Sequence, residues 1–207
     1  MREAVGLDER ARAGLTEAVS LAAKWHGTQL RKGTPIPYLS HLLQVAGLVL
    51  EHGGSVDAAI AGLLHDSLED AESPEERAER EATIQRVFGP SVLDIVLACT
   101  DTGADEAAGA KRAWRPRKEA YLQSLQAKTG PSVLVAACDK RHNLGALVND
   151  VRAHGRGYLD SFNAGADEQL WFFEQFIEAS RGKGWPRLDK ELDQLLTEFR
   201  ELLTKRD

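Results

Sequence analysis

The residues best suited to chemistry lie in one hexapeptide, which runs from His65 to Asp70 and has the sequence His-Asp-Ser-Leu-Glu-Asp. Residues four apart on a helix share a face, so a helical hexapeptide would gather one imidazole and three carboxylates in a single patch. The preceding residues, 58–64, are apolar on almost every side and predict a buried helix. Unpaired charges are costly to bury, so such a cluster needs a cation, a basic partner or a water-filled cleft. Metal binding is therefore the first hypothesis.

Two further apolar segments end on side chains that can bind a metal. Ser40 is suited to cap a helix that begins at His41 and continues through apolar positions. Residues 133–138 are continuously apolar and stop at Asp139. Three buried segments are thus expected to deliver ligand-type side chains at an end: His41, His65, Asp66 and Asp139. This mixed nitrogen and oxygen set suits Mn²⁺ or Fe²⁺ with open positions for water, and Zn²⁺ less typically.

Length and composition limit the class of protein. The 207 residues suffice for one domain, or for one domain with a terminal helix, and 43% apolar with 28% charged residues is ordinary for a globular protein. The first ten residues contain no apolar run and no later segment is apolar enough to span a bilayer, so we expect a cytoplasmic protein. The net charge of −6 argues against binding of extended nucleic acid. Cys99 and Cys138 lie in apolar runs and are expected to be buried, reduced thiols.

Helical periodicity dominates the hydrophobic pattern. It predicts helices over residues 8–27, 41–53, 56–70, 74–88, 90–100, 114–128, 131–153, 166–181 and 187–205. Between the first two, a glycine and two prolines exclude helix and favour a short irregular segment or hairpin near residues 29–39. Residues 103–109 and 154–165 contain several glycines and are expected to be irregular, the first as a mobile loop near the site. The last predicted helix is amphipathic.

Three ordered motifs resemble those of the HD-domain phosphohydrolases, and most closely those of the alarmone hydrolase domain of the RelA/SpoT family. They are Arg31-Lys32 with Pro37, Tyr38 and His41; His65-Asp66 with Glu69-Asp70; and Asp139-Lys140 with His142-Asn143. The ordered spacing of all three is much more specific than any one of them. The resemblance covers roughly residues 15–180, and the chain is similar in size to the small stand-alone alarmone hydrolases.

The resemblance implies an all-α fold, an HD-domain helical bundle that binds Mn²⁺ through the four ligand candidates His41, His65, Asp66 and Asp139. Residues 1–183 are then the HD-type domain, and residues 184–207 a C-terminal amphipathic helix packed on it or on a partner subunit. The implied reaction removes the 3′-diphosphate of guanosine 3′,5′-bis(diphosphate), ppGpp or pppGpp, and releases GDP or GTP and pyrophosphate. The implied partner is this small nucleotide, and no membrane association is expected. The chain is expected to be a monomer or a homodimer.

Other polar residues suggest roles around such a centre. Glu69 and Asp70 are suited to orient a water molecule and take its proton, unless they themselves bind the metal. Arg31 can stack on a purine, and Lys32 can meet a phosphate. Asn143 can hydrogen-bond ribose or base. The alternative for the acid pair is a solvated helix end.

Two further assignments, a basic run and a tryptophan, each have a purely structural alternative. A basic run could hold the diphosphate, or could be an exposed helix start: Lys111, Arg112, Arg115, Arg117 and Lys118. Trp171 stands about where small hydrolases often place a substrate-facing tyrosine, although its spacing with the neighbouring phenylalanines is also typical of a core. Three histidines show no partner in the sequence and receive no role: His26, His52 and His154.

Departures from the family pattern leave the substrate open. Leu42 stands where the family usually has a proline, and Ala146 where bifunctional members place a hydroxyl. One alternative is an HD nucleotidase or phosphodiesterase acting on another 2′- or 3′-phosphorylated nucleotide. An alternative from a different class is a non-catalytic nucleotide sensor. Glu69 and Asp70 favour an enzyme, because a pure binder has no need of a water-activating pair.

Overall fold

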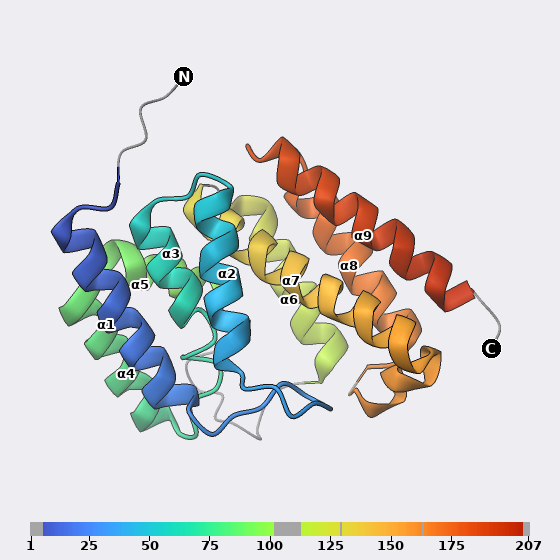
Figure 1. Ribbon diagram of the computed structural model, residues 1–207, viewed down its shortest axis with the longest axis horizontal. Helices are drawn as coiled ribbons and strands as arrows, with labels where there is room; N and C mark the ends of the chain where they lie inside the picture. Colours follow the sequence, from blue (N-terminus) through green and yellow to red (C-terminus); the bar gives the residue numbers. More distant parts are fainter. Residues whose placement is uncertain (1–5, 102–112, 129, 163, 205–207) are drawn as a thin grey trace.

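The predicted all-α fold is confirmed. The computed structural model describes residues 6–101, 113–128, 130–162 and 164–204, and within these ranges it has nine α-helices, one 3₁₀ helix and no β-strand. In chain order (Figure 1) the elements are α1 (Glu9–His26), α2 (Leu39–Glu51), α3 (Val56–Leu64), α4 (Pro74–Phe88), α5 (Pro90–Cys99), α6 (Trp114–Ala127), α7 (Pro131–His154), the 3₁₀ helix η1 (Arg156–Ser161), α8 (Ala166–Ser180) and α9 (Pro186–Thr204).

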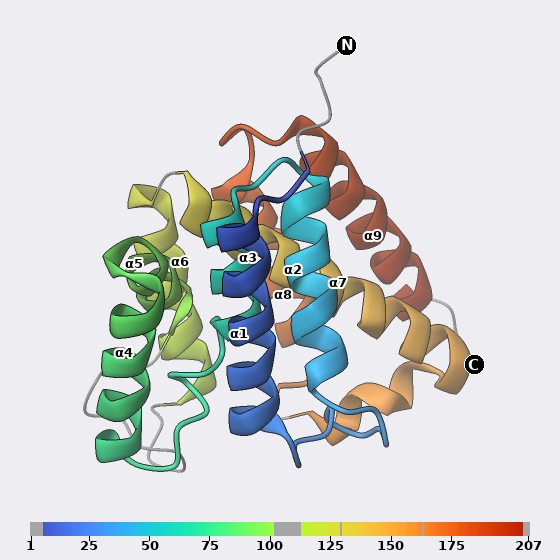
Figure 2. The ribbon, with the colours of Figure 1, turned by 60° about the vertical axis from the view of Figure 1, so that its left-hand side comes forward.

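The long helix α7 lies between two groups of helices. On one side it contacts α2, α3 and α5, with α1 packed on α2 and α3, and α4 packed on α5. On the other side it contacts α8 and α9 (Figures 1 and 2). Helix α3 is surrounded by α1, α2, α5 and α7, and all of its residues from Ala58 to Leu64 are buried. The apolar segment before the hexapeptide is therefore at the centre of one half of the molecule.

Local capping explains where some helices begin. The Asp8 carboxylate accepts an amide hydrogen bond in the first turn of α1 at 2.7 Å. Ser40 was expected to cap the second helix, but α2 already begins at Leu39, and its N-cap residue Tyr38 makes no side-chain cap hydrogen bond. The Ser40 prediction is wrong because the carbonyl of Tyr38 already accepts from the amide of His41 at 2.9 Å, which starts the helix earlier.

Helix α3 ends at Leu64, although the periodicity predicts a helix up to residue 70. The hexapeptide that follows forms consecutive turns. Two contacts divert carbonyl groups that a continuing helix would use: the Ser67 hydroxyl donates to the Leu64 carbonyl, and Arg80 of α4 donates to the Ser67 carbonyl, both at 2.6 Å. The amide of Asp70 still donates to the Asp66 carbonyl at 3.0 Å. The acidic side chains therefore keep a helix-like spacing without a helix.

The short extended segment before α2 is a hairpin, in agreement with the sequence. Leu30 and Pro37 form an isolated antiparallel bridge, and the amide of Arg31 donates to the Ile36 carbonyl at 2.8 Å. Gly33 has a φ of 75°, a left-handed conformation that favours glycine at the turn. The hairpin joins α1 to α2 below both helices in the view of Figure 2.

The two predicted irregular segments have different outcomes. Residues 103–109 lie outside the described residues. Residues 154–165 are partly helical, because η1 spans Arg156–Ser161. Cys138 is a buried free thiol, as expected, whereas the free thiol of Cys99 is only half-buried.

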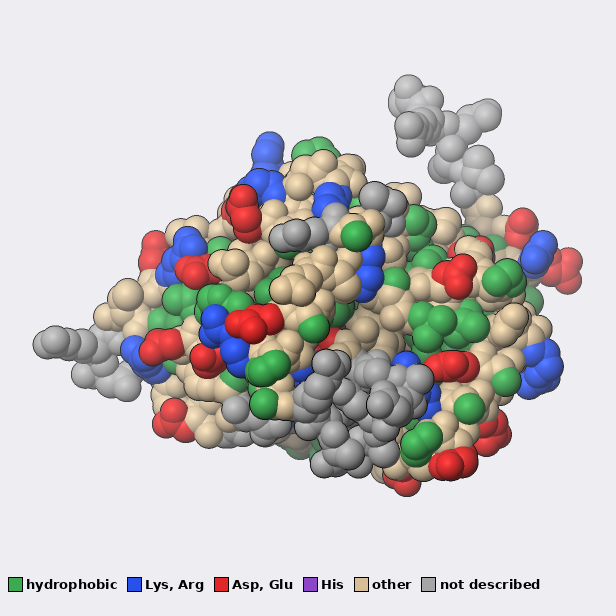
Figure 3. All heavy atoms as spheres, turned by 180° about the vertical axis from the view of Figure 1, so that it is seen from behind, with side chains coloured by type: hydrophobic (Ala, Val, Ile, Leu, Met, Phe, Trp, Pro, Cys, Tyr) green, Lys and Arg blue, Asp and Glu red, His purple; other side chains and the backbone are tan. Residues whose placement is uncertain are grey.

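The surface and helix lengths bear on possible partners. Acidic and basic side chains are interspersed among the described residues on the face seen in Figure 3. In the part of the chain that the structure describes, no helix combines the length and apolarity needed to cross a membrane. Nothing on this face forms the continuous basic surface that extended nucleic acid would require.

Helix α9 packs on α7 and α8 of the same chain. Its apolar stripe is buried there and consists of Leu188, Leu192, Leu196, Phe199 and Leu203. The Phe199 ring meets the Phe173 ring edge to face, with their centroids 6.4 Å apart. The helix therefore completes the apolar core on that side of α7, while the division of the chain at residue 183 stays a prediction.

We expect Phe199→Ala to lower the free energy of unfolding by about 3–5 kcal/mol, since it removes a fully buried aromatic ring and leaves a cavity. Urea unfolding measures the loss. Gln194→Ala on the exposed face of the same helix is the matched control and should change little. Equal stability of the two variants would contradict a core role for α9.

Candidate active site

Three buried side chains from different helices converge on one point. His41 comes from α2, His65 directly follows α3, and Asp139 comes from α7. One ligand-type atom from each lies within 4.8 Å of the others. The Nε2 atom of His41 is 3.3 Å from Oδ1 of Asp139, and that of His65 is 3.6 Å from the same oxygen. Among the described residues this is the arrangement suited to hold one cation.

The hydrogen bonds of the two imidazoles leave their Nε2 atoms for a metal. His65 donates from Nδ1 to the Gly62 carbonyl at 2.8 Å. The Nδ1 atom of His41 lies 2.9 Å from Nδ1 of His142. Burial, and then the neighbouring His41 and Arg31, lower the pKa of His142 to about 3, so His142 is neutral and accepts from His41. Both Nε2 atoms are buried and lack a hydrogen-bond partner in the described part of the chain. Two buried ring nitrogens that face carboxylates fit a metal ion, which would take the place of any proton on them.

The electrostatics of the cluster favour positive charge at its centre. Burial opposes protonation of His65, yet the carboxylates of Asp66 and Asp139 hold the pKa of His65 well above its usual range. Burial also opposes ionisation of Asp139, yet Lys140 and His65 hold the pKa of that carboxyl well below its usual range. The ammonium of Lys140 contacts the Asp139 carboxylate directly. Carboxylates this deeply buried stay ionised only beside cations, and a bound divalent ion would supply that charge.

Asp66 lies at the edge of the cluster. Its Oδ2 is 3.0 Å from Nε2 of His65 and 3.6 Å from Nε2 of His41. The same oxygen accepts a 2.5 Å hydrogen bond from the Tyr38 hydroxyl of the hairpin. Burial and then Asp66 raise the pKa of Tyr38 well above its usual range, so the phenol stays protonated and donates. Tyr38 thus orients a candidate ligand through its hydroxyl group.

The acid pair is held by different partners on its two members. Glu69 accepts from Arg117 of α6 at 3.3 Å, and Asp70 accepts from the Gln29 amide nitrogen at 2.9 Å. Arg117 also pairs with the buried carboxylate of Asp101 at 2.5 Å. Both acids are half-buried beside the metal cluster. Arg117 therefore supports Glu69 in this structure, and it is absent from the wall of the cavity described next.

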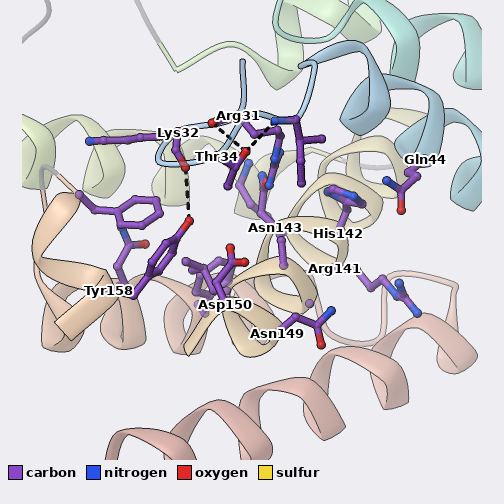
Figure 4. Close-up of a pocket in the computed structure, with 18 of the residues that line it drawn as sticks. Arg31, Lys32, Thr34, Gln44, Arg141, His142, Asn143, Asn149, Asp150 and Tyr158 are labelled. Carbon is purple, nitrogen blue, oxygen red and sulfur yellow. Dashed lines mark hydrogen bonds between the residues drawn. The ribbon is translucent and has the colours of Figure 1, made fainter. Parts of the chain in front are cut away.

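A cavity of about 630 Å³ adjoins the cluster. Among the residues lining it are the predicted Arg31, Lys32 and Asn143 (Figure 4). Arg31 donates to the Asn143 side-chain oxygen at 3.1 Å, and the Asn143 amide nitrogen donates to Asp139 at 2.6 Å. Arg31, Asn143 and Asp139 form a hydrogen-bonded path from the cavity wall to the metal cluster.

The sequence missed several residues of this wall. Tyr158 of η1 donates to the Lys32 carbonyl at 3.4 Å, and the Lys32 ammonium lies 5.3 Å from the centre of the Phe162 ring. Figure 4 shows Asp150 and Tyr158 on the side of the cavity opposite the hairpin. The aromatic residues in the glycine-containing stretch 154–165 could have indicated a contact with another part of the protein, because an irregular loop does not require large aromatic side chains for its own conformation.

Two sequence-based assignments lie elsewhere. Trp171 is not among the residues lining the cavity: its ring lies 3.3 Å from the guanidinium carbon of Arg115 and edge-on to Trp114, which does line the cavity. In the basic run, Lys111 and Arg112 lie outside the described residues, and Lys118 is in the cavity wall while it pairs with Asp101 at 2.5 Å. The structure thus brings Arg31, Lys32 and Asn143 to the cavity, whereas Trp171 and Arg117 are not among the residues that line it.

The helical fold and the buried nitrogen and oxygen cluster define a class of metal-binding, all-α domains. The chain belongs to the HD domain family, since the sequence model of that family matches residues 18–157.

Individual relatives narrow the resemblance. The guanosine-3′,5′-bis(diphosphate) 3′-pyrophosphohydrolase MESH1 of Danio rerio is 35% identical over 137 residues, which cover 64% of this chain and 68% of the relative. A probable guanosine-3′,5′-bis(diphosphate) 3′-pyrophosphohydrolase of Mycoplasma pneumoniae is 30% identical over 54% of this chain. The chain spans only 14% of that protein and 17% of a GTP pyrophosphokinase of Myxococcus xanthus.

Solved structures agree on the fold. A metazoan ortholog of SpoT, described as hydrolysing ppGpp, superposes with a TM-score of 0.73 and 21% identity over 96% of this chain and 99% of that structure. The Listeria monocytogenes protein lmo0812 gives a TM-score of 0.64 and 23% identity over 77% of this chain and 99% of its own. At these identities the similarity establishes the fold alone.

We expect Asp101→Asn to destabilise the protein by about 2 kcal/mol at neutral pH, as for a paired carboxyl of this pKa. Lys118 and Arg117 outweigh burial and lower the pKa of Asp101 to about 2. Because this pKa is below the unfolded value of about 4, the stabilisation is present above that pH and is lost as the pH falls towards 2. Urea unfolding at pH 7 and pH 3 should show the deficit of the variant shrinking in acid. The exposed Asp94→Asn is the control, and a deficit independent of pH would contradict the ion pair.

Proposed function

We propose that this protein is a metal-dependent hydrolase that removes the 3′-diphosphate of ppGpp or pppGpp. The observation that carries the proposal is the junction between the buried cluster and the cavity, where Asn143 bonds Asp139 on one side and Arg31 on the other. The names of the MESH1 relatives support the substrate, and the chain covers 68% of one of them. The acid pair beside the cluster supports turnover over mere binding.

The metal we propose is Mn²⁺, with Fe²⁺ or Zn²⁺ as alternatives, held by His41, His65, Asp66 and Asp139. The choice rests on a donor set of two imidazoles and two carboxylates. These nitrogen and oxygen atoms are harder Lewis bases than a thiolate sulfur and suit these metals. These residues would hold the ion, and its positive charge would make water more acidic and phosphoryl oxygen more polarised at this place. The ligand role of Asp66 is supported by its 3.0 Å distance to Nε2 of His65.

The side chains around the centre divide the remaining work. Glu69 and Asp70 take the proton of the attacking water, and Arg117 donates a hydrogen bond to Glu69. Arg31 stacks on the purine and Lys32 meets a phosphate that does not react. In hydrolysis the water oxygen bonds to the phosphorus on O3′, the P–O3′ bond breaks, and the ribose oxygen takes up a proton. The products are GDP or GTP and intact pyrophosphate.

Further sequence-based predictions stay proposals. We propose a cytoplasmic protein that acts as a monomer or homodimer, with an HD-type domain over residues 1–183. Trp171 and Arg117 would serve the substrate indirectly, through Arg115 or Trp114 and through Glu69. Hydrolysis of another 2′- or 3′-phosphorylated nucleotide is the second candidate function, since Ala146 offers no hydroxyl to the cavity that it lines.

The metal proposal predicts that the purified protein binds close to one Mn²⁺ or Fe²⁺ ion for each chain. His65→Ala and Asp139→Ala should each lose it and lower the melting temperature, because the remaining ligands become unpaired buried groups. Elemental analysis and a thermal shift on adding Mn²⁺ provide the measurements. His154→Ala removes an exposed imidazole and should keep the metal. A wild-type protein with no transition metal and no thermal shift would rule out the site.

The hydrolase proposal predicts that chromatography of a reaction with ppGpp and Mn²⁺ shows GDP and pyrophosphate. Glu69→Ala and Asp70→Ala should keep metal and nucleotide binding but lose turnover by ~10² or more, the usual scale for a general base. Orthophosphate as the main product, or equal rates on nucleotides without a 3′ group, would favour a general HD nucleotidase. Binding of ppGpp without any turnover by wild type would favour the sensor.

A further inference from the structure

His26, a residue with no assigned role, is connected by hydrogen bonds to the acid pair. It is the last residue of α1 and is 2% exposed. Its Nδ1 atom lies 2.6 Å from the side-chain oxygen of Gln29, and the Gln29 amide nitrogen donates to Oδ2 of Asp70 at 2.9 Å. Neither His26 nor Gln29 lines the cavity. The hydrogen-bond series His26–Gln29–Asp70 therefore reaches the acid pair from residues that do not line the cavity.

We propose that Gln29 is a positioning residue that holds Asp70 in place to accept the proton of the attacking water, and that His26 sets the direction of the Gln29 amide. The proposal rests on the proposed hydrolase function, because it is that function which makes Asp70 a proton acceptor. It assigns roles to two residues that the metal, the acid pair and the cavity wall leave unused.

The order of donors and acceptors along this chain has one consistent solution. An ionised carboxylate only accepts hydrogen bonds, so the amide nitrogen of Gln29 must face Asp70. The amide oxygen then faces His26, which must donate from Nδ1. The Nε2 atom of His26 is buried without a hydrogen-bond partner in the described part of the chain, so Nδ1 is the ring nitrogen whose proton forms the hydrogen bond to Gln29. A flipped amide would place two acceptors against each other at Asp70.

The main chain restrains Gln29 from both sides. Its amide donates to the His26 carbonyl at 3.0 Å, and its carbonyl accepts from the amide of Tyr38 at 2.8 Å. The His26 ring also stacks on the Tyr38 ring, with centroids 5.5 Å apart, and Tyr38 donates to Asp66. His26, Gln29 and Tyr38 thus restrain both aspartates of the hexapeptide.

The hexapeptide needs this support because it is a series of turns. A continuous helix would fix its side chains through its own backbone hydrogen bonds, whereas α3 has ended at Leu64. Gln29 therefore supplies from the hairpin part of the rigidity that the turn lacks. Loss of this contact should loosen Asp70 while the metal ligands and the cavity wall stay in place.

The principal test is Gln29→Met, which keeps the length of the side chain and removes its hydrogen bonds. We expect kcat on the nucleotide that wild type hydrolyses best to fall on the order of 10- to 100-fold, the usual loss for a residue supporting a ligand or catalytic group. KM and bound Mn²⁺ should stay at wild-type values. Gln29→Glu replaces the donor with an acceptor at equal size and should lose at least as much. Gln85→Met, at an exposed glutamine of α4, is the control.

Variants of His26 separate orientation from packing. His26→Asn places an amide N–H near the position of Nδ1 and should retain most of kcat. His26→Phe keeps an aromatic ring without the donor, and its kcat should fall as that of Gln29→Met does. The double variant His26→Phe with Gln29→Met should be no slower than Gln29→Met alone, because His26 acts on Asp70 only through the Gln29 side chain. Additive losses, or equal kcat for Asn and Phe at position 26, would contradict the proposed order.

Nitrogen NMR of the His26 ring gives a readout independent of turnover. We expect its proton on Nδ1 in wild type, with the resonance assigned from the His26 variants. A proton on Nε2, or wild-type kcat in both Gln29→Met and Gln29→Glu, overturns the proposal. If wild type hydrolyses no nucleotide, the proposed function fails, while the position of the His26 proton still supports or overturns the amide orientation.

Discussion

The arrangement depends on one constraint, the burial of two imidazoles and one carboxylate at a single point, with a second, half-buried carboxylate at its edge. Such charges are tolerated inside a protein only when they are paired or bind a cation. His41, His65 and Asp139 reach that point from three different segments, and the entirely buried α3 brings His65 to it. The ammonium of Lys140 beside Asp139 offsets part of the negative charge. The packing of α2, α3 and α7 therefore determines the geometry of the ligands.

The hairpin before α2 connects this cluster to its surroundings. Its residues Tyr38 and Gln29 donate hydrogen bonds to the two aspartates of the hexapeptide. Its residue Arg31 donates a hydrogen bond to Asn143 of α7. Its own conformation is fixed by the Leu30–Pro37 bridge and the turn at Gly33. A short segment without regular secondary structure can position functional groups when both of its ends lead into packed helices.

The structure shows which departures from the family pattern can affect the nucleotide, because one lies in the core and the other lines the cavity. Leu42 is fully buried in the core, so its side chain packs inside the protein and cannot face a nucleotide. Ala146 does line the cavity, where it removes a potential hydroxyl contact. Asp150 and Tyr158 occupy the far wall and supply polar groups of their own. Differences in substrate preference are therefore expected to originate in the cavity wall and not at the residue after His41.

The amino-acid pattern was enough to predict the helical class, the approximate bounds of most helices, the hairpin and a set of ligand candidates, because apolar periodicity reports burial and the polar residues at the ends of apolar runs stand out. It could not show that the hexapeptide is a series of turns, since Arg80 of α4 helps to end α3. It assigned no role to His26 or Tyr158 and placed Trp171 towards the substrate. These points depend on packing between distant segments, because the contacts involved join residues far apart in the chain, as Arg31 and Asn143 are, separated by 112 positions. Local pattern carries no information about such partners.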